Sequence, residues 1–128
     1  MRRPKVAGAD GRKHPRINVG SDHTLQFIAK NTEFKGLELA NLSTGGCCSR
    51  VPRHKVEFLE VGMAIHFMVI VHQKLPHVPL IGRIAWIMGG QHRGRNSHAL
   101  VGIAFSNPNP QFLETLGGHL ENIRETLS

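Results

Sequence analysis

Two arginines near the start of the chain, Arg12 and Arg16, stand four residues apart with Pro15 between them. That spacing would suit a helix, but the proline and the flanking glycines favour an extended conformation. Residues an even number apart in an extended chain point to the same side, so the two guanidinium groups would project together. Each offers a planar fork of donors that fits phosphate oxygens or the O6/N7 edge of guanine. We interpret the pair as a clamp for a ligand with several acceptors; the alternative is a solvated basic tail.

A second polar stretch, NLSTGG, covers residues 41–46. Asn41 and Ser43 are two residues apart, so an amide and a hydroxyl can point to the same side where a strand ends. Gly45 and Gly46 permit positive φ and leave room for a ligand close to the backbone. The residues alone leave two interpretations open, a ligand-binding turn and an ordinary Asx or Ser turn in a hairpin.

The other side chains capable of chemistry form no catalytic or metal-binding pattern. Of the nine histidines, no pair has a recurrent zinc spacing with cysteines nearby, although His66 and His72 would share a strand face. Cys47 and Cys48 are the only cysteines, so no disulfide framework is expected and a reducing cytosol is the natural compartment. The nine carboxylates are scattered. We therefore expect neither a metal site nor an enzyme.

The composition predicts one globular domain with an anionic partner. The 128 residues are 40% hydrophobic and 20% charged, and the formal net charge is +7. Six of the 16 Lys and Arg residues, against a single acid, fall within the first 16 residues. No apolar run approaches the roughly 18 residues that a membrane span needs, and no secretory segment precedes the domain, so we expect a cytoplasmic protein.

Six stretches with alternating or β-branched hydrophobic residues, bounded by turn signals, predict short strands. They cover residues 23–30, 34–42, 47–51, 63–72, 80–88 and 98–105. Six strands at this spacing predict a mainly β fold, a closed or sandwich-like antiparallel barrel spanning residues 21–128 after a mobile basic arm at residues 1–20. Trp86 would share a face with Ile84 and Met88 in the core; the alternative is a stacking surface at the barrel mouth.

The end of the chain predicts a helix over residues 109–127. Asn109 can serve as N-cap with Pro110 at the first helical position. Apolar residues recur at steps of three and four on one face, at Phe112, Leu116, Leu120, Ile123 and Leu127. We expect this face to pack on the barrel; the alternative is that it also serves a homodimer.

In their order and context, the two polar stretches resemble the motifs of a known family. Arg12 and Arg16 match an RxxxR motif, and Asn41, Ser43 and Gly46 match a (D/N)xSxxG motif about 25 residues later. This combination, within six strands and a terminal helix, resembles the PilZ domain, whose members bind the bacterial second messenger cyclic di-GMP. The last predicted strand adds the family's Gly–x–x–Phe pattern, and the resemblance covers roughly residues 12–125.

The resemblance implies a six-stranded antiparallel β-barrel and a set of ligand contacts. The arginines would reach guanine edges and phosphates, the amide and hydroxyl would hydrogen-bond the ligand, and the glycine would keep the turn tight. The residues so implied are Arg12, Arg16, Asn41, Ser43 and Gly46, with Lys13 and Trp86 as secondary candidates. Family members that carry another arginine directly before the motif tend to bind a stacked ligand dimer. This chain has Gly11 at that position, so the resemblance implies a single bound ligand.

The function we expect is that of a non-catalytic receptor for cyclic di-GMP. Ligand would bridge the arm to the barrel, and an unidentified partner protein would respond to the rearranged surface. A nucleic-acid-binding barrel that uses the basic arm is one alternative. The aromatic content of only 5% and the absence of Tyr count against it, because single strands bind on stacking platforms. A PilZ-like adaptor without ligand binding is the other alternative.

Overall fold

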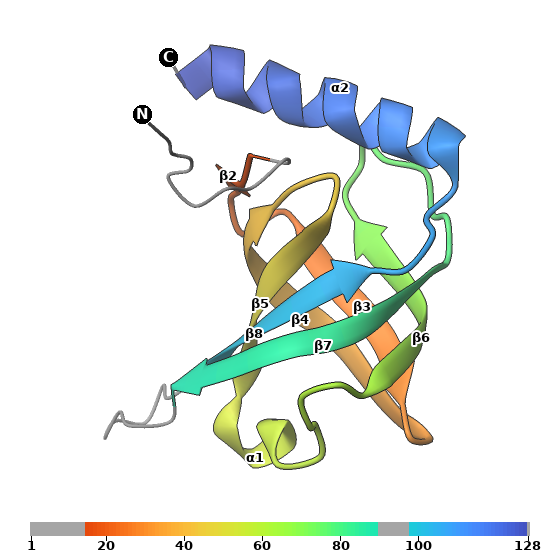
Figure 1. The fold of residues 1–128 in the computed structure, drawn as a ribbon. Helices are drawn as coiled ribbons and strands as arrows, with labels where there is room; N and C mark the ends of the chain where they lie inside the picture. Colours follow the sequence, from red (N-terminus) through yellow and green to blue (C-terminus); the bar gives the residue numbers. More distant parts are fainter. Residues whose placement is uncertain (1–14, 90–97, 128) are drawn as a thin grey trace, which may run out of the picture.

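The computed structural model describes residues 15–89 and 98–127, which form a β-barrel with one long helix (Figure 1). The elements follow in the order β2 (Ile17–Asn18), β3 (Thr24–Ala29), β4 (Thr32–Leu42), β5 (Gly46–Pro52), α1 (Arg53–Val56), β6 (Ala64–Val71), β7 (Leu80–Gly89), β8 (His98–Phe105) and α2 (Pro110–Leu127). Arg12 and Lys13 lie outside the described residues, as does Gly11.

The barrel closes through six antiparallel strands in the order β4-β3-β6-β7-β8-β5, with β5 pairing back onto β4. Closure depends on the length of β4, which pairs with β3 over its first part and with β5 over its last. The two-residue strand β2 adds to the free edge of β4 at its end. The predicted six-stranded antiparallel barrel with a C-terminal helix is therefore confirmed.

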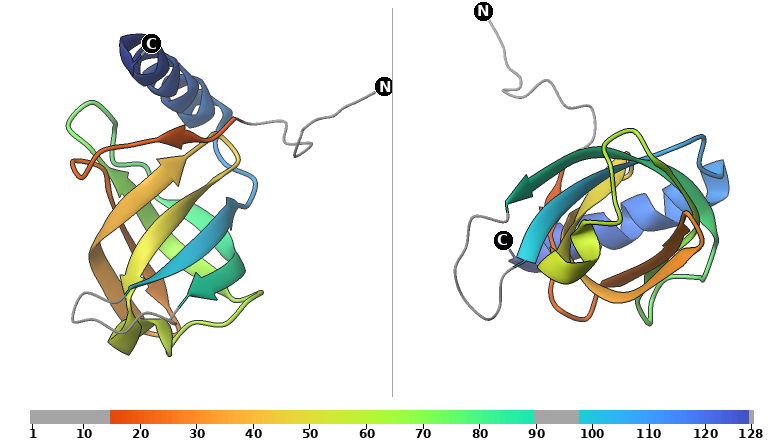
Figure 2. Two further views of the ribbon diagram at one scale, coloured as in Figure 1. Left: turned by 90° about the vertical axis from the view of Figure 1, so that its left-hand side faces the viewer. Right: turned by 90° about the horizontal axis from the view of Figure 1, so that it is seen from below.

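The core fills the barrel and continues under α2. Phe27 and Phe34, at the β3–β4 hairpin, stack with ring centroids 4.8 Å apart and are fully buried. Phe112 and Leu116 of α2 belong to the same buried cluster. Seen end-on in Figure 2, the strands form a closed ring, and α2 lies across the far end. One end of the barrel is thus covered by the helix, as its apolar stripe predicts.

The start of α2 is set by its predicted cap. The Oδ1 atom of Asn109 accepts hydrogen bonds from the backbone N–H of Gln111, at 2.7 Å, and of Phe112, at 3.2 Å. These bonds satisfy two of the amides that a helix leaves unpaired at its first turn. Among the described residues, no helix is long and apolar enough to cross a membrane.

Candidate functional site

A row of register-paired residues crosses five neighbouring strands on the outside of the barrel. Asn18 pairs with Asn41, Asn41 with Cys48, Cys48 with Gly102, and Gly102 with Trp86. Directly paired residues share one face of a sheet. One neighbour of each member on β4 and β5, and both neighbours on β8, belong to the core, so the row lies on the outer face, although Cys48 is only 3% exposed there. We call these five residues the outer row.

The tryptophan covers the glycine within this row. A Cβ atom placed on Gly102 would lie 2.2 Å from Cε2 and 2.3 Å from Nε1 of Trp86, so the indole rests directly against the glycine backbone. Trp86 is half-buried, which leaves part of its aromatic surface free to contact a ligand. The outer row thus ends on an aromatic platform.

The prediction that Trp86 belongs to the core with Ile84 and Met88 is wrong. The register of β7 against β8 shifts between Ile84 and Trp86, which leaves Ala85 as an extra residue. A single extra residue reverses the inside–outside alternation beyond it. Ile87 therefore packs against the core, and Met88 is 61% exposed.

Arg16 directly precedes β2, so it lies beside the Asn18 end of the outer row. Ile17 pairs with Leu42, so continuing this antiparallel register places Arg16 opposite Ser43. The Arg16 side chain is half-buried. The pKa of the Cys48 thiol is raised because the thiol is buried, and the nearby positive charge of Arg16 partly offsets this rise. A positive charge therefore stands beside the outer row.

Ser43 is buried and builds the turn between β4 and β5. Its Oγ accepts hydrogen bonds from the backbone N–H groups of Gly45 and Gly46, both at 3.1 Å, and donates to the carbonyl of Gly46 at 3.2 Å. A hydroxyl has one donor and two acceptor sites, so these bonds use its full capacity. The structure thus gives Ser43 a role in shaping the turn.

Gly46 is required for a reason other than the one predicted from sequence. Neither it nor Gly45 has a positive φ. A Cβ atom on Gly46 would lie 2.2 Å from the carbonyl oxygen of Ile103, so the expected room for a ligand is filled by β8. The glycine permits the close approach of β5 to β8.

Asn41 carries an acceptor without a donor. Its Oδ1 atom is buried and has no hydrogen-bond partner within the described ranges, 15–89 and 98–127. Such atoms are rare in folded proteins, because leaving a buried polar atom unpaired costs about 1–3 kcal/mol. The residue belongs to the outer row, so this unpaired oxygen is one of the polar atoms of that face.

The structure thus divides the predicted site. Arg16, Asn41 and Trp86 lie along one outer face, whereas Ser43 and Gly46 form the turn beside it. Sequence reasoning missed the part played by Asn18 and Cys48, because only the strand register aligns them. The one signal in the sequence was that Cys47 and Cys48, as neighbours on a strand, must point to opposite faces of the sheet.

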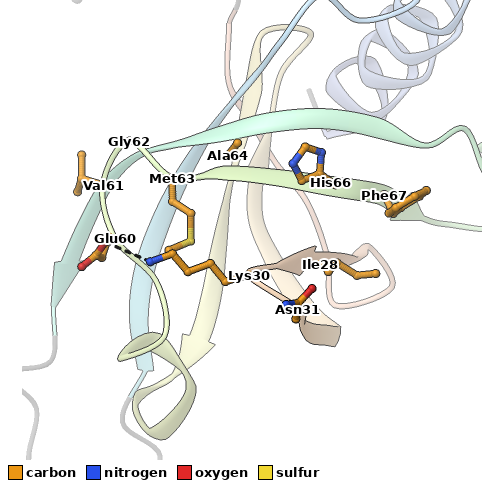
Figure 3. Close-up of a pocket in the computed structure, with 10 residues that line it drawn as sticks. All are labelled: Ile28, Lys30, Asn31, Glu60, Val61, Gly62, Met63, Ala64, His66 and Phe67. Atoms are coloured by element: carbon orange, nitrogen blue, oxygen red, sulfur yellow. Dashed lines mark ion pairs between the residues drawn. The ribbon is translucent and has the colours of Figure 1, made fainter.

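A separate groove of about 740 Å³ lies at the end of the barrel away from α2 (Figure 3). It runs between the β3–β4 hairpin and the segment that leads into β6, where Lys30 and Glu60 form an exposed ion pair at 3.8 Å. Phe67 lines it with a φ of 51° and 66% exposure. None of the motif residues that the structure describes lines this groove, so it is distinct from the outer row.

Comparisons with known proteins agree with this fold. The PilZ domain family model matches residues 10–122. None of the curated proteins matches the chain significantly. The PilZ domain of YcgR from Escherichia coli, solved with c-di-GMP, aligns with a TM-score of 0.71 and 19% identity, over 92% of this chain and 98% of that one.

Two longer proteins contain a similar domain. The K. pneumoniae MrkH–c-di-GMP complex aligns with a TM-score of 0.72 and 15% identity, over 92% of this chain and 52% of MrkH. The Bacillus subtilis inhibitor of motility MotI/DgrA aligns with a TM-score of 0.69 and 14% identity, over 92% and 52%. This chain therefore spans about half of each. Because the family model covers most of the sequence, the chain belongs to the PilZ domain family.

Proposed function

We propose that this protein is a cyclic di-GMP receptor that binds the nucleotide on the outer row and signals to a partner protein. PilZ domains are typically receptors for c-di-GMP and are generally binding domains without catalytic activity. The observation that carries the proposal is the unpaired, buried Oδ1 of Asn41, which lies within the family motif and beside Arg16. The two related structures from E. coli and K. pneumoniae, each described as holding c-di-GMP, support the choice of ligand.

The chemistry of the ligand fits the groups on this face. Cyclic di-GMP presents two phosphates and two guanines. The Arg16 guanidinium offers paired donors to a phosphate or to a guanine edge. The Asn41 Oδ1 accepts from a guanine N–H, and Trp86 offers an aromatic surface on which a base can stack for about 1–3 kcal/mol. Arg12 and Lys13 would close over the ligand from the arm.

The signal would leave the site through β2. Arg16 directly precedes this strand, which pairs with β4 and contacts α2. Ligand that fixes Arg16 and the residues before it changes the surface beside β2 and α2, and a partner protein would bind there.

The test is calorimetric titration of the full chain with cyclic di-GMP. Arg16→Ala should weaken binding by a factor of roughly 5–30, because an arginine contact to a nucleobase or phosphate contributes about 1–2 kcal/mol. The matched control is Arg53→Ala, on α1 at the opposite end of the barrel, which should bind as the wild type does (Figure 1). Absence of binding heat for the wild type, or equal affinities for the two variants, would overturn the proposal.

A titration with single-stranded DNA separates the nucleic-acid alternative. Binding through a basic arm alone falls steeply as salt rises and tolerates many sequences. The proposed receptor should instead bind cyclic di-GMP in preference to GMP or DNA, and the fluorescence of Trp86, the single tryptophan, should change on binding.

A further inference from the structure

Three histidines from separate elements meet beneath α2. His23 precedes β3, His72 follows β6 and His119 lies in α2, and one ring nitrogen from each lies within 4.8 Å of the others. The side chains are buried, with residue exposures of 3%, 8% and 9%. The rings of His23 and His72 stack with centroids 4.0 Å apart, and His119 tilts against both. We call these three residues the histidine cluster.

A hydrogen bond to Asp22 fixes the His23 ring in the orientation and tautomer that a metal ligand needs. Asp22 Oδ1 lies 3.0 Å from His23 Nδ1. An ionised carboxylate can only accept, so Nδ1 carries the proton and Nε2 presents a lone pair. Metal-bound histidines usually donate the N–H of the nitrogen that does not bind the metal to a carboxylate or a similar acceptor, since this bond fixes the tautomer and the ring orientation.

The lone pair of His23 faces another imidazole. Its Nε2 lies 2.9 Å from Nε2 of His119, so one proton is shared between the two nitrogens and belongs to His119. Burial lowers the pKa of both rings, which favours the neutral imidazole. The neutral form is the one that binds metals.

His72 completes the group from the other side of Asp22. Its Nε2 lies 3.2 Å from Asp22 Oδ2, and its Nδ1 accepts a hydrogen bond from the backbone N–H of Lys74 at 3.0 Å. One of these bonds must open before the ring can bind an ion. The Asp22 side chain is 67% exposed, so its Oδ2 can release His72 at little cost while its Oδ1 keeps the bond to His23 Nδ1.

We propose that the histidine cluster binds one divalent transition-metal ion of the zinc class through His23, His72 and His119. Zinc–nitrogen bonds of about 2.0–2.1 Å place tetrahedral ligand atoms about 3.3 Å apart, close to the spacing already present between His23 and His119. The ion would take the place of the proton that His119 holds between these two nitrogens, and that proton moves through solvent to Nδ1 of His119, so both rings stay neutral. A neighbouring cavity of about 310 Å³ leaves the fourth position open.

This inference departs from the sequence-based expectation that no metal site exists. His23 and His119 are 96 residues apart, so no local spacing can indicate the site. It does not depend on cyclic di-GMP binding. Its structural consequence is a link between α2 and two loops of the barrel, at the covered end.

The test uses the full chain without an affinity tag, stripped of metal with a chelator. The wild type should bind one Zn²⁺, and Co²⁺ in its place should give the intense visible absorption of a tetrahedral nitrogen site. At a hundredfold excess over Kd, zinc should raise the Tm by roughly 5–15 °C. His119→Gln should lose at least about tenfold in affinity, whereas the matched control His66→Gln, an exposed histidine on β6, should not.

Asp22→Asn gives a second variant in case His119→Gln does not fold, because Asp22 is exposed. Loss of a supporting carboxylate typically weakens metal binding by about 10–100-fold. Circular dichroism of each metal-free variant checks the fold. The proposal is overturned if the wild type does not bind zinc, or if the folded variants bind it as tightly as the wild type does, which would leave the cluster a hydrogen-bonded packing feature.

Discussion

The contact between Gly46 and β8 predicts that a single added methyl group at this glycine destabilises the fold. A Cβ atom there would lie 2.2 Å from the Ile103 oxygen and 3.2 Å from the Ala104 Cα. Both obstacles are backbone atoms of a paired strand, so no side-chain rotation can relieve the clash. Gly46→Ala therefore forces β5 and β8 apart at the residue pair that Gly46 forms with Ala104.

The magnitude follows from what the displacement disturbs. Overpacking a filled interior typically costs about 1–3 kcal/mol. The shift also strains the turn, because the Gly46 carbonyl accepts the backbone N–H of Ser43 at 2.9 Å. The reduced entropy of the unfolded chain returns only about 0.4–1 kcal/mol. We expect a net loss of about 1–2 kcal/mol, which lowers the Tm of a domain of this size by roughly 5 °C.

Urea unfolding followed by Trp86 fluorescence and by far-UV circular dichroism measures this loss. The matched control is Gly118→Ala in α2, where an added Cβ would meet nothing within 4 Å. That variant should gain about 0.5–1 kcal/mol, the ordinary advantage of alanine over glycine in a helix. If Gly46→Ala were as stable as the wild type, the close approach of β5 to β8 would be refuted.

Three further predictions concern the site and the thiols. Asn41→Ala should change the free energy of unfolding by less than about 1 kcal/mol, since it removes an unpaired oxygen, yet weaken cyclic di-GMP binding about tenfold by calorimetry; a large loss of stability would contradict this. Ser43→Ala should lower the free energy of unfolding by about 1–3 kcal/mol in urea, because two turn amides lose their acceptor; unchanged stability would show that water replaces the hydroxyl. Burial raises the pKa of Cys47 to about 12, above its ordinary value of 9.0, so stability should fall as pH rises from 9 toward 12. In Cys47→Ala, the urea midpoint should fall less between these pH values than in the wild type. If the urea midpoints of the two proteins fall in parallel with pH, the buried thiol is not the cause.

The fold was predictable because its signals are local. Alternating hydrophobic residues indicated all six barrel strands, and the helical stripe with Asn109 indicated α2. The side of the sheet on which Trp86 lies was not predictable in this way, because it depends on where one extra residue, Ala85, interrupts the β7–β8 register. The two-residue strand β2 and the four-residue helix α1 are too short to carry a periodic pattern.

The candidate site was predictable only as far as its motif extends. Arg16 and Asn41 emerged from their motifs, and in the structure Asn41 belongs to the outer row while Arg16 precedes the strand that pairs with it. Cys48 and Gly102 join that row through strand pairing, which sequence periodicity does not specify. The histidine cluster is the extreme case, since its members come close only after the barrel has closed and α2 has packed across its end.

The outer row and the histidine cluster share one short segment of chain. Arg16 stands at its start, β2 pairs with Asn41 and Leu42 in the middle, and His23 stands at its end. A zinc ion that joins His23 to α2 would restrain this segment from one side, and cyclic di-GMP bound to Arg16 would restrain it from the other. A restraint already imposed by one ligand lowers the ordering cost for the second, and such coupling is reciprocal. Zinc should therefore tighten cyclic di-GMP binding by a severalfold factor in the wild type and not in His119→Gln; equal nucleotide affinities with and without zinc would mean that the segment transmits nothing between the two sites.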